Sequence, residues 1–217
     1  MIKHIIFDCD GVLIDTEIVA ADVVSAFLRS EQVQISKEEF ITRFTGKTFT
    51  DIIELLKSDG ALPKDFDTTA AVPVLDQEIR NNQRAIAGAP ELLQRLSLPF
   101  SVVSNSAKDY VEEALEKLEV RQLVQDRVFS AEQVAKGKPS PMVYELALTT
   151  IGLHPENVLV IEDSHSGVVA STSAGIKTIG FLGGSHIRTG HKERLMALGC
   201  QQTVSSHTEL AQLLEQI

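Results

Sequence analysis

The sequence predicts an α/β protein: a doubly wound, Rossmann-like parallel sheet core with an inserted, mainly helical cap domain. From Phe100 to Phe181, short apolar runs alternate with helical patterns, which is typical of a parallel sheet covered on both faces. One further apolar run, Ile5-Ile6-Phe7, stands near the start of the chain and ends at the turn Asp10-Gly11. Residues 15–85 contain no convincing strand pattern, which predicts the helical insertion.

The core elements follow from these runs and from the residues that punctuate them. Pro90 and Pro141 each predict a helix start, because proline suits the first helical turn. Ser106 and Ser164 are expected to cap two further helices. In a sheet of this kind, ligands bind beyond the carboxyl ends of the strands. The predicted strands are 5–7, 100–104, 158–162 and 178–181.

The insertion has its own helical patterns, and Ser36 with Glu39 forms a capping box for one of them. A helical insertion directly after the first strand is expected above that strand's carboxyl end, where it could act as a lid. We therefore place the core at residues 1–14 and 86–217 and the cap at residues 15–85. The predicted cap helices are 16–28, 36–44, 50–57 and 67–84.

Composition predicts a folded domain and argues against nucleic-acid binding. The chain has 217 residues, 43% of them hydrophobic, which suffices for a domain with an inserted smaller one. Lys and Arg number 20 against 30 Asp and Glu, with no basic run, so we expect no nucleic-acid partner.

The compartment is predicted from the first residues and from the cysteines. Lys3, Asp8 and Asp10 leave no room for the long apolar stretch of a secretory signal. No apolar run is long enough to span a membrane. Cys9 and Cys200 are too few and too far apart for a disulfide framework. We therefore expect a cytoplasmic protein with no membrane partner, while the sequence leaves the oligomeric state undetermined.

Four carboxylates follow two of the predicted strands. Asp8 and Asp10 come after the first strand, Glu162 ends the run 158–162, and Asp163 follows it. Such hard oxygen ligands suit Mg²⁺, whereas zinc would favour His or Cys. Carboxylates brought together repel one another unless a cation compensates. The sequence therefore predicts a magnesium site.

Two groups suited to phosphate belong to the same edge of the sheet. Ser104 ends its strand, and Lys138 lies in Lys136-Gly137-Lys138-Pro139. A hydroxyl and an ammonium are the donors that phosphoryl oxygens require. Alone, Lys138 would be interpreted as a solvated charge and Ser104 as a turn residue. With the carboxylates, they predict phosphoryl transfer to Asp8.

Together these motifs resemble the haloacid dehalogenase superfamily over nearly the whole chain. The segment order resembles the subgroup that contains β-phosphoglucomutase, phosphoglycolate phosphatase and sugar-phosphate phosphatases, which carry a helical cap between the first two motifs. The motifs that carry the resemblance are Asp8-x-Asp10-Gly11, Ser104-Asn105-Ser106, Lys138-Pro139 and Glu162-Asp163-Ser164.

The resemblance implies a role for each matching residue. Asp8 would become a phosphoaspartate, and Asp10 would protonate the leaving group and then activate water. Ser104 and Lys138 would hold the phosphoryl oxygens. The implied metal ligands are Asp8, the Asp10 backbone carbonyl, Glu162 and Asp163. The implied substrate-binding residues are Asn105 and Ser106, with Gly46 and Lys47 of a cap loop.

Three other functions are less consistent with these residues than a phosphatase. A phosphomutase is the nearest, but where β-phosphoglucomutase has a histidine and an arginine in the cap, this chain has Ala20 and Phe49. A haloalkanoate dehalogenase would need neither a metal nor Asp10, and a catalytically silent binding protein would be free to lose Asp8 or Lys138. We therefore expect a Mg²⁺-dependent phosphatase for a small phosphate monoester, such as a sugar phosphate or a sugar-acid phosphate like phosphogluconate.

Several residues keep open roles. Asp15 is expected to cap the first cap helix, and Glu17 could charge that helix or face the substrate. The six histidines show no ligand spacing, so most are expected to be surface or satisfied structural residues. The loop Gly183-Gly184-Ser185-His186 is expected at the edge of the site without an assigned role.

Overall fold

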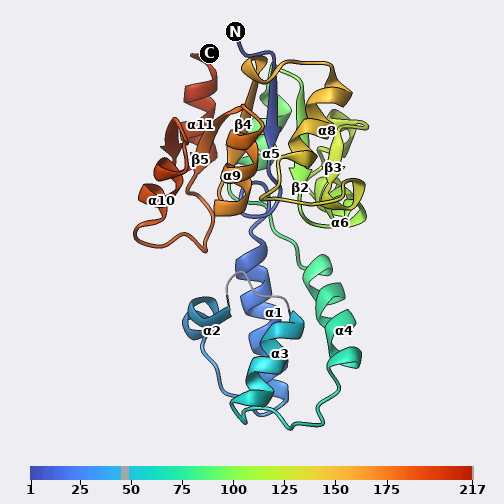
Figure 1. The fold of residues 1–217 in the computed structure, drawn as a ribbon. Helices are drawn as coiled ribbons and strands as arrows, with labels where there is room; N and C mark the ends of the chain where they lie inside the picture. Colours follow the sequence, from blue (N-terminus) through green and yellow to red (C-terminus); the bar gives the residue numbers. More distant parts are fainter. Residues whose placement is uncertain (45–48, 217) are drawn as a thin grey trace. The chain divides into compact units, whose positions relative to one another are not determined.

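The computed structural model describes residues 1–44 and 49–216. It divides into two compact units, which Figure 1 traces in sequence colours. The core unit consists of Met1–Asp15 and Ala85–Ile217, and the cap unit of Thr16–Arg84.

The core unit contains a six-stranded parallel sheet in the order β3-β2-β1-β4-β5-β6, which confirms the predicted fold class. The four predicted strands are present, and the sequence missed β3 and β6. The strands are β1 (His4–Phe7), β2 (Phe100–Ser104), β3 (Val128–Ser130), β4 (Val158–Glu162), β5 (Lys177–Phe181) and β6 (Gln202–Val204).

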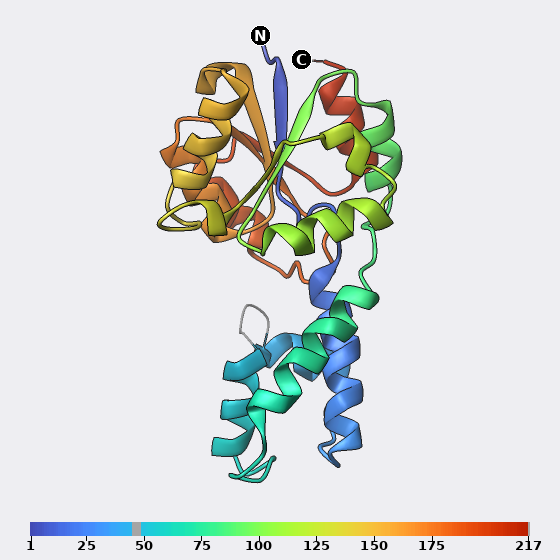
Figure 2. The ribbon, with the colours of Figure 1, turned by 90° about the vertical axis from the view of Figure 1, so that its right-hand side faces the viewer.

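Helices cover both faces of this sheet, as Figure 2 shows. Successive side chains of β1 point to opposite faces. Ile5 and Phe7 join a cluster with α5 (Ala89–Arg95), α6 (Lys108–Lys117), α7 (Arg121–Val124) and α11 (His207–Leu214). Ile6 joins a second cluster with α8 (Met142–Ile151) and α9 (His165–Ser173), and α10 (His191–Ala197) packs beside α9.

The strand order places the predicted site at a topological switch point. The central strand β1 pairs with β2 on one side and with β4 on the other. Phe7 lies opposite Ile161, so β1 and β4 end side by side. Asp8 follows directly after Phe7, and Glu162 ends β4. A crevice at such a point is where open α/β sheets bind ligands.

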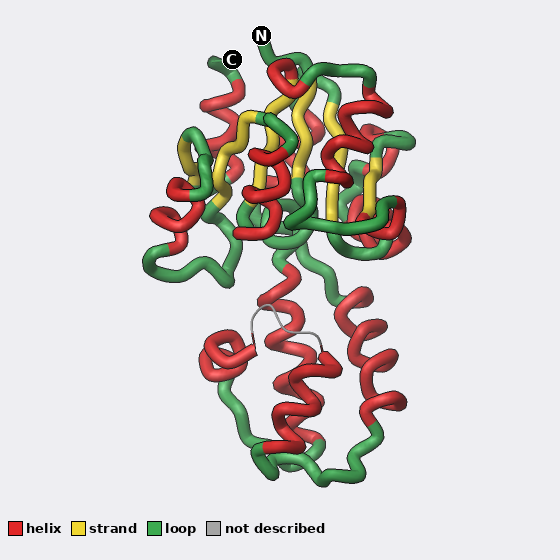
Figure 3. The backbone as a smooth tube through the Cα atoms, viewed as in Figure 1, coloured by secondary structure: helices red, strands yellow, loops and turns green. Residues whose placement is uncertain are grey.

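The cap unit is helical, as predicted (Figure 3). It has its own hydrophobic core. The Ser36 hydroxyl accepts a hydrogen bond from the Glu39 amide at 3.1 Å, as expected for a helix start. No helix among the described residues combines the length and apolarity needed to cross a membrane. The cap helices are α1 (Thr16–Ser30), α2 (Lys37–Phe44), α3 (Phe49–Ser58) and α4 (Thr68–Asn81).

The two predicted serine caps of the core have opposite outcomes. Ser164 caps α9, because its hydroxyl accepts a hydrogen bond from the Gly167 amide at 3.0 Å. The Ser106 cap is wrong: α6 begins after Ala107, which provides no side-chain cap. The Ser106 hydroxyl is instead bonded within the candidate site.

Candidate active site

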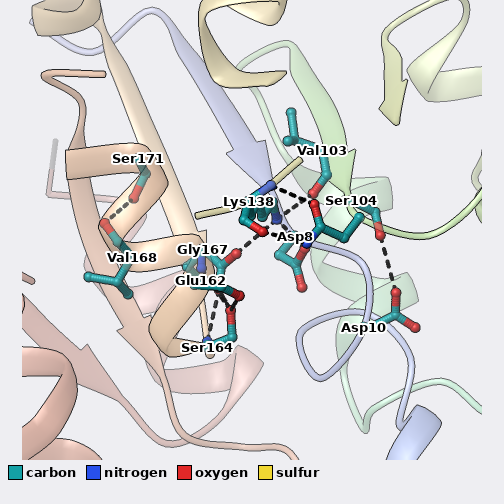
Figure 4. A network of polar contacts seen from close by, with 12 residues as sticks. Asp8, Asp10, Val103, Ser104, Lys138, Glu162, Ser164, Gly167, Val168 and Ser171 are labelled. Atoms are coloured by element: carbon teal, nitrogen blue, oxygen red, sulfur yellow. Dashed lines mark hydrogen bonds and ion pairs between the residues drawn. The ribbon is translucent and has the colours of Figure 1, made fainter. Parts of the chain in front are cut away.

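Lys138 lies at the centre of the candidate site, buried between two carboxylates (Figure 4). Its Nζ donates to Asp8 Oδ1 at 2.5 Å, to Glu162 Oε1 at 2.8 Å and to the Val103 carbonyl at 2.9 Å. An ammonium has three N–H donors, so these contacts use all of them. The Lys138 ammonium is therefore fixed beside the predicted nucleophile.

The backbone of Lys138 is held as firmly as its side chain. The Asn105 side-chain amide donates to the Lys138 carbonyl at 3.0 Å and accepts from the Lys138 N–H at 2.7 Å. Gly137 makes this possible, because a Cβ there would lie 2.6 Å from Asn105 Oδ1. Asn105, predicted to line the substrate mouth, thus positions Lys138 across 33 residues of chain.

Asp163 presents a buried carboxylate whose two oxygens have different surroundings. Oδ2 pairs with His186 Nε2 at 3.0 Å. Oδ1 is buried without a hydrogen-bond partner in the described structure. Ligand oxygens of Asp8, Glu162 and Asp163 lie within 4.8 Å of one another. A group of hard oxygen ligands with one unsatisfied buried oxygen fits a divalent cation such as Mg²⁺.

The electrostatics of the site also favour a cation. Burial raises the pKa of Asp8, and the neighbouring carboxylates raise it further against the opposing effect of Lys138. Burial and then Glu162 likewise raise the pKa of Asp163. For Lys138, burial opposes the charged form, but Asp8 and Glu162 outweigh it and hold the pKa of the ammonium well above its usual value. One ammonium among three buried carboxylates leaves an excess of negative charge, which a divalent cation would compensate.

Asp10 turns its carboxylate toward two serines. The Ser106 hydroxyl donates to Asp10 Oδ2 at 2.7 Å, and the Ser104 hydroxyl donates to the same oxygen at 3.2 Å. The Ser104 hydroxyl also accepts from the Ser106 amide at 2.9 Å. The loop after β2 therefore positions the predicted acid/base Asp10. It also positions the Ser104 hydroxyl, which is predicted to donate a hydrogen bond to the phosphoryl group.

Glu162 links Lys138 to the start of α9. Its Oε2 accepts from the Ser164 amide at 2.8 Å and from the Ser164 hydroxyl at 3.0 Å. The carboxylate occupies the volume that a side chain at Gly167 would need, since a Cβ there would lie 1.4 Å from Oε1. The absence of a side chain at Gly167 is therefore part of the site.

Replacing Gly167 with Ala is expected to destabilise the protein, although alanine is normally the better helix former by about 1 kcal/mol. The new methyl group must displace the Glu162 carboxylate, and such overpacking costs about 1–3 kcal/mol. Thermal unfolding in EDTA should show a lower Tm for G167A. The exposed neighbour His165 provides the control, because H165A changes the same helix without reaching Glu162. A Tm for G167A at or above the wild-type value would contradict this packing argument.

Gly46 and Lys47, the predicted cap-loop residues, lie outside the described residues. Glu17 lies in the first turn of α1. Asp15, the predicted cap of the first cap helix, accepts a hydrogen bond at Oδ1 from the Ser185 hydroxyl at 2.6 Å.

Sequence reasoning missed two histidines. His186 reaches Asp163 from the loop after β5, and His191 Nε2 lies 2.5 Å from the Asp163 carbonyl oxygen. His186, in the loop expected at the edge of the site without an assigned role, thus contacts a predicted metal ligand. No ligand spacing could reveal these contacts, because they form between segments more than 20 residues apart.

The comparison with known families now decides the class of protein. The family model described as haloacid dehalogenase-like hydrolase matches residues 5–181, which include every core residue predicted for the site. The chain belongs to this family. Its relatives are named phosphatases, which confirms the prediction of an enzyme that hydrolyses phosphoric monoesters.

Known proteins of similar length resemble this hydrolase over most of the chain. It is 26% identical to the 6-phosphogluconate phosphatase of Escherichia coli strain K12 over 189 residues, 85% of each chain. A haloacid dehalogenase family hydrolase from Deinococcus radiodurans, solved with bound phosphate and sodium, is 29% identical with a TM-score of 0.86, covering 99% of this chain and 96% of the other. A proposed β-phosphoglucomutase from Thermotoga maritima has a TM-score of 0.84 over the whole of both chains at 23% identity, which shows a shared fold.

Proposed function

We propose that this hydrolase is a Mg²⁺-dependent phosphatase that transfers the phosphoryl group of a small phosphate monoester to Asp8 and then to water. The observation that carries the proposal is the arrangement around Asp8: a buried nucleophile paired with Lys138, with Glu162 and Asp163 close by. The phosphatase relatives and the hydrolase solved with phosphate support the same reaction.

The first step forms a bond between an Asp8 carboxylate oxygen and phosphorus while the bond from phosphorus to the ester oxygen breaks. Asp10 donates its proton to the departing oxygen, which leaves as an alcohol. We expect Lys138 and the Ser104 hydroxyl to stabilise the phosphoryl oxygens, because Lys138 contacts Asp8 and Ser104 contacts Asp10. Since all three Lys138 donors are already bonded, the ammonium would exchange one of these contacts for a phosphoryl oxygen.

The second step returns the nucleophile to its starting state. Asp10, now ionised, accepts a proton from water as the water oxygen bonds to phosphorus. The bond between phosphorus and Asp8 breaks, which releases inorganic phosphate and regenerates the Asp8 carboxylate. The same carboxylate at Asp10 thus serves as acid and then as base.

The proposed Mg²⁺ ligands are the carboxylates of Asp8, Glu162 and Asp163 with the backbone carbonyl of Asp10. The bound ion would neutralise charge between the anionic nucleophile and an anionic phosphate. Both Glu162 oxygens already accept two hydrogen bonds: Oε1 from Lys138 and, at 3.4 Å, from the Tyr144 hydroxyl, and Oε2 from the amide and hydroxyl of Ser164. Glu162 would therefore exchange one of these contacts for the cation.

The substrate is proposed to be a monophosphorylated sugar or sugar acid, with phosphogluconate as one example. The relative that acts on 6-phosphogluconate supports this class. At the two cap positions that distinguish the mutase, Ala20 and Phe49 are partly buried and pack against the hydrophobic core of the cap. Neither can grip a second phosphate as an arginine would, which favours hydrolysis over the mutase reaction.

To test the proposed function, the protein is incubated with Mg²⁺ and a panel of phosphate esters that includes sugar bisphosphates and sugar 1-phosphates. Released phosphate and isomerised sugar phosphate are measured in parallel. We expect phosphate release that EDTA abolishes and excess Mg²⁺ restores. Isomerised sugar phosphate as the main product would favour the mutase, and hydrolysis that persists at full rate in EDTA would contradict the metal site.

Replacing Ser106 with Ala is expected to lower kcat by about tenfold with little change in KM. The substitution removes the shorter of two hydrogen bonds to the proposed acid/base Asp10, and general acid–base catalysis contributes about 10²–10⁴-fold. Steady-state kinetics on the best ester of the panel would measure both constants. Ser106→Thr keeps the hydroxyl and should restore kcat, whereas a raised KM at constant kcat would make Ser106 a substrate contact instead.

A further inference from the structure

The loop between β5 and α10 contacts the proposed metal site through a residue that the reaction above does not use. We propose that His186 is a positioning residue that holds the Asp163 carboxylate in the orientation that binds a divalent cation. The inference rests on the proposed function, because it requires Asp163 to be a metal ligand.

The contact between the two residues leaves one oxygen of Asp163 available. His186 Nε2 lies 3.0 Å from Asp163 Oδ2, and the side chains are 11% and 4% exposed. An ionised carboxylate only accepts hydrogen bonds, so Nε2 carries the proton and donates it. Asp163 Oδ1 is buried without a hydrogen-bond partner in the described part of the chain. The imidazole thus fixes one oxygen while the other remains for a cation.

Two glycines provide the space for this contact. A Cβ at Gly11 would lie 1.9 Å from Asp163 Oδ2 and 2.9 Å from His186 Cε1. A Cβ at Gly184 would lie 2.7 Å from the same His186 carbon. The side chain of any other residue at position 11 would therefore collide with Asp163 and His186.

The loop itself is anchored on both sides of His186. The neighbouring Ser185 donates its hydroxyl to Asp15 Oδ1 at 2.6 Å, which ties the loop to the segment after β1. On the other side, His191 Nε2 lies 2.5 Å from the Asp163 carbonyl oxygen, an acceptor, and so donates to it. The two imidazoles meet edge to face, with ring centroids 5.9 Å apart. Asp163 is thus held at its carbonyl and at its carboxylate.

Fixing a ligand in advance strengthens metal binding. Hydrogen bonds from outside the ligand shell orient carboxylate ligands, and their loss typically weakens metal affinity about 10–100-fold. Without His186, both Asp163 oxygens would lack a side-chain donor, and the carboxylate could rotate away from Asp8 and Glu162.

The test measures Mg²⁺ binding by isothermal titration calorimetry, independently of catalysis. H186A should raise the Kd for Mg²⁺ by about 10–100-fold. H186Q, whose amide nitrogen can reach the position of Nε2, should return the Kd to within about threefold of wild type, while the shorter H186N should not. The exposed His154 provides the control, and H154A should bind Mg²⁺ as wild type does. Tm values in EDTA verify that each variant is folded.

The outcomes separate this inference from the proposed function. Wild-type protein that binds no Mg²⁺ would overturn the proposed function and, with it, the role of His186. Wild-type binding with an unchanged Kd in H186A would overturn the positioning role alone. If H186A is too unstable to titrate, H186Q and H186N decide, because equal affinities in these two variants would overturn the inference.

Discussion

Phosphate release is expected to fall by roughly 10⁴-fold or more when Asp8 is replaced with Asn, because the amide cannot act as the nucleophile. Asn has nearly the same shape as Asp, so the surrounding core should remain packed. The measurement is the initial rate of phosphate release with Mg²⁺ and the best ester of the panel. Radiolabelled phosphate from the substrate should label the wild-type protein transiently in a hydroxylamine-sensitive bond and should not label D8N.

The matched control for D8N is Asp126→Asn, which makes the same chemical change at an exposed aspartate after α7. D126N should retain the wild-type rate and label. A D8N variant that kept more than about 1% of wild-type activity would contradict covalent catalysis by Asp8, since loss of a nucleophile costs far more.

Replacing Lys138 with Met is expected to lower the free energy of unfolding by about 3–5 kcal/mol in EDTA. The substitution leaves Asp8 and Glu162 without their shared cation, and their side chains are only 8% and 0% exposed. For a chain of this size each kcal/mol corresponds to about 2–4 °C in Tm, so calorimetry should show a decrease of about 10 °C. Phosphate release should also be lost.

An exposed ion pair provides the control for K138M. Lys37 pairs with Asp22 at 2.7 Å, but both side chains are more than a third exposed, at 39% and 37%. Such pairs contribute about 0–1 kcal/mol, so K37M should change the Tm little. Adding D8N to K138M removes one of the stranded charges and should recover part of the lost stability. Equal effects of K138M and K37M would show that the buried cluster does not depend on Lys138.

The sequence predicted the strands that are continuous apolar runs and missed those that are not. β1, β2, β4 and β5 lie inside the sheet and show the run expected of strands covered on both faces. β3 and β6 are the edge strands, with three residues each, and β6 begins with the exposed Gln202. Periodicity cannot identify strands this short, because their pairing partners stabilise them more than their own pattern does.

The sequence predicted the site residues whose positions are fixed by the end of a strand. Asp8, Ser104 and Glu162 lie at the ends of paired strands, so the sheet order alone brings them together. Ser106 and His186 depend on the side-chain directions of loops. The Ser106 hydroxyl could have capped α6, and only the tertiary contact with Asp10, 96 residues away, decides otherwise.

The separate hydrophobic core of the cap unit has a consequence for engineering this protein. Its buried residues come entirely from within Thr16–Arg84, and the clusters around the sheet come entirely from the other unit. Substitutions inside the hydrophobic core of the cap therefore leave the hydrophobic packing around the sheet unchanged. Variants with altered cap packing can therefore be made and tested without changing a side chain of the hydrophobic clusters that support Asp8 and Lys138.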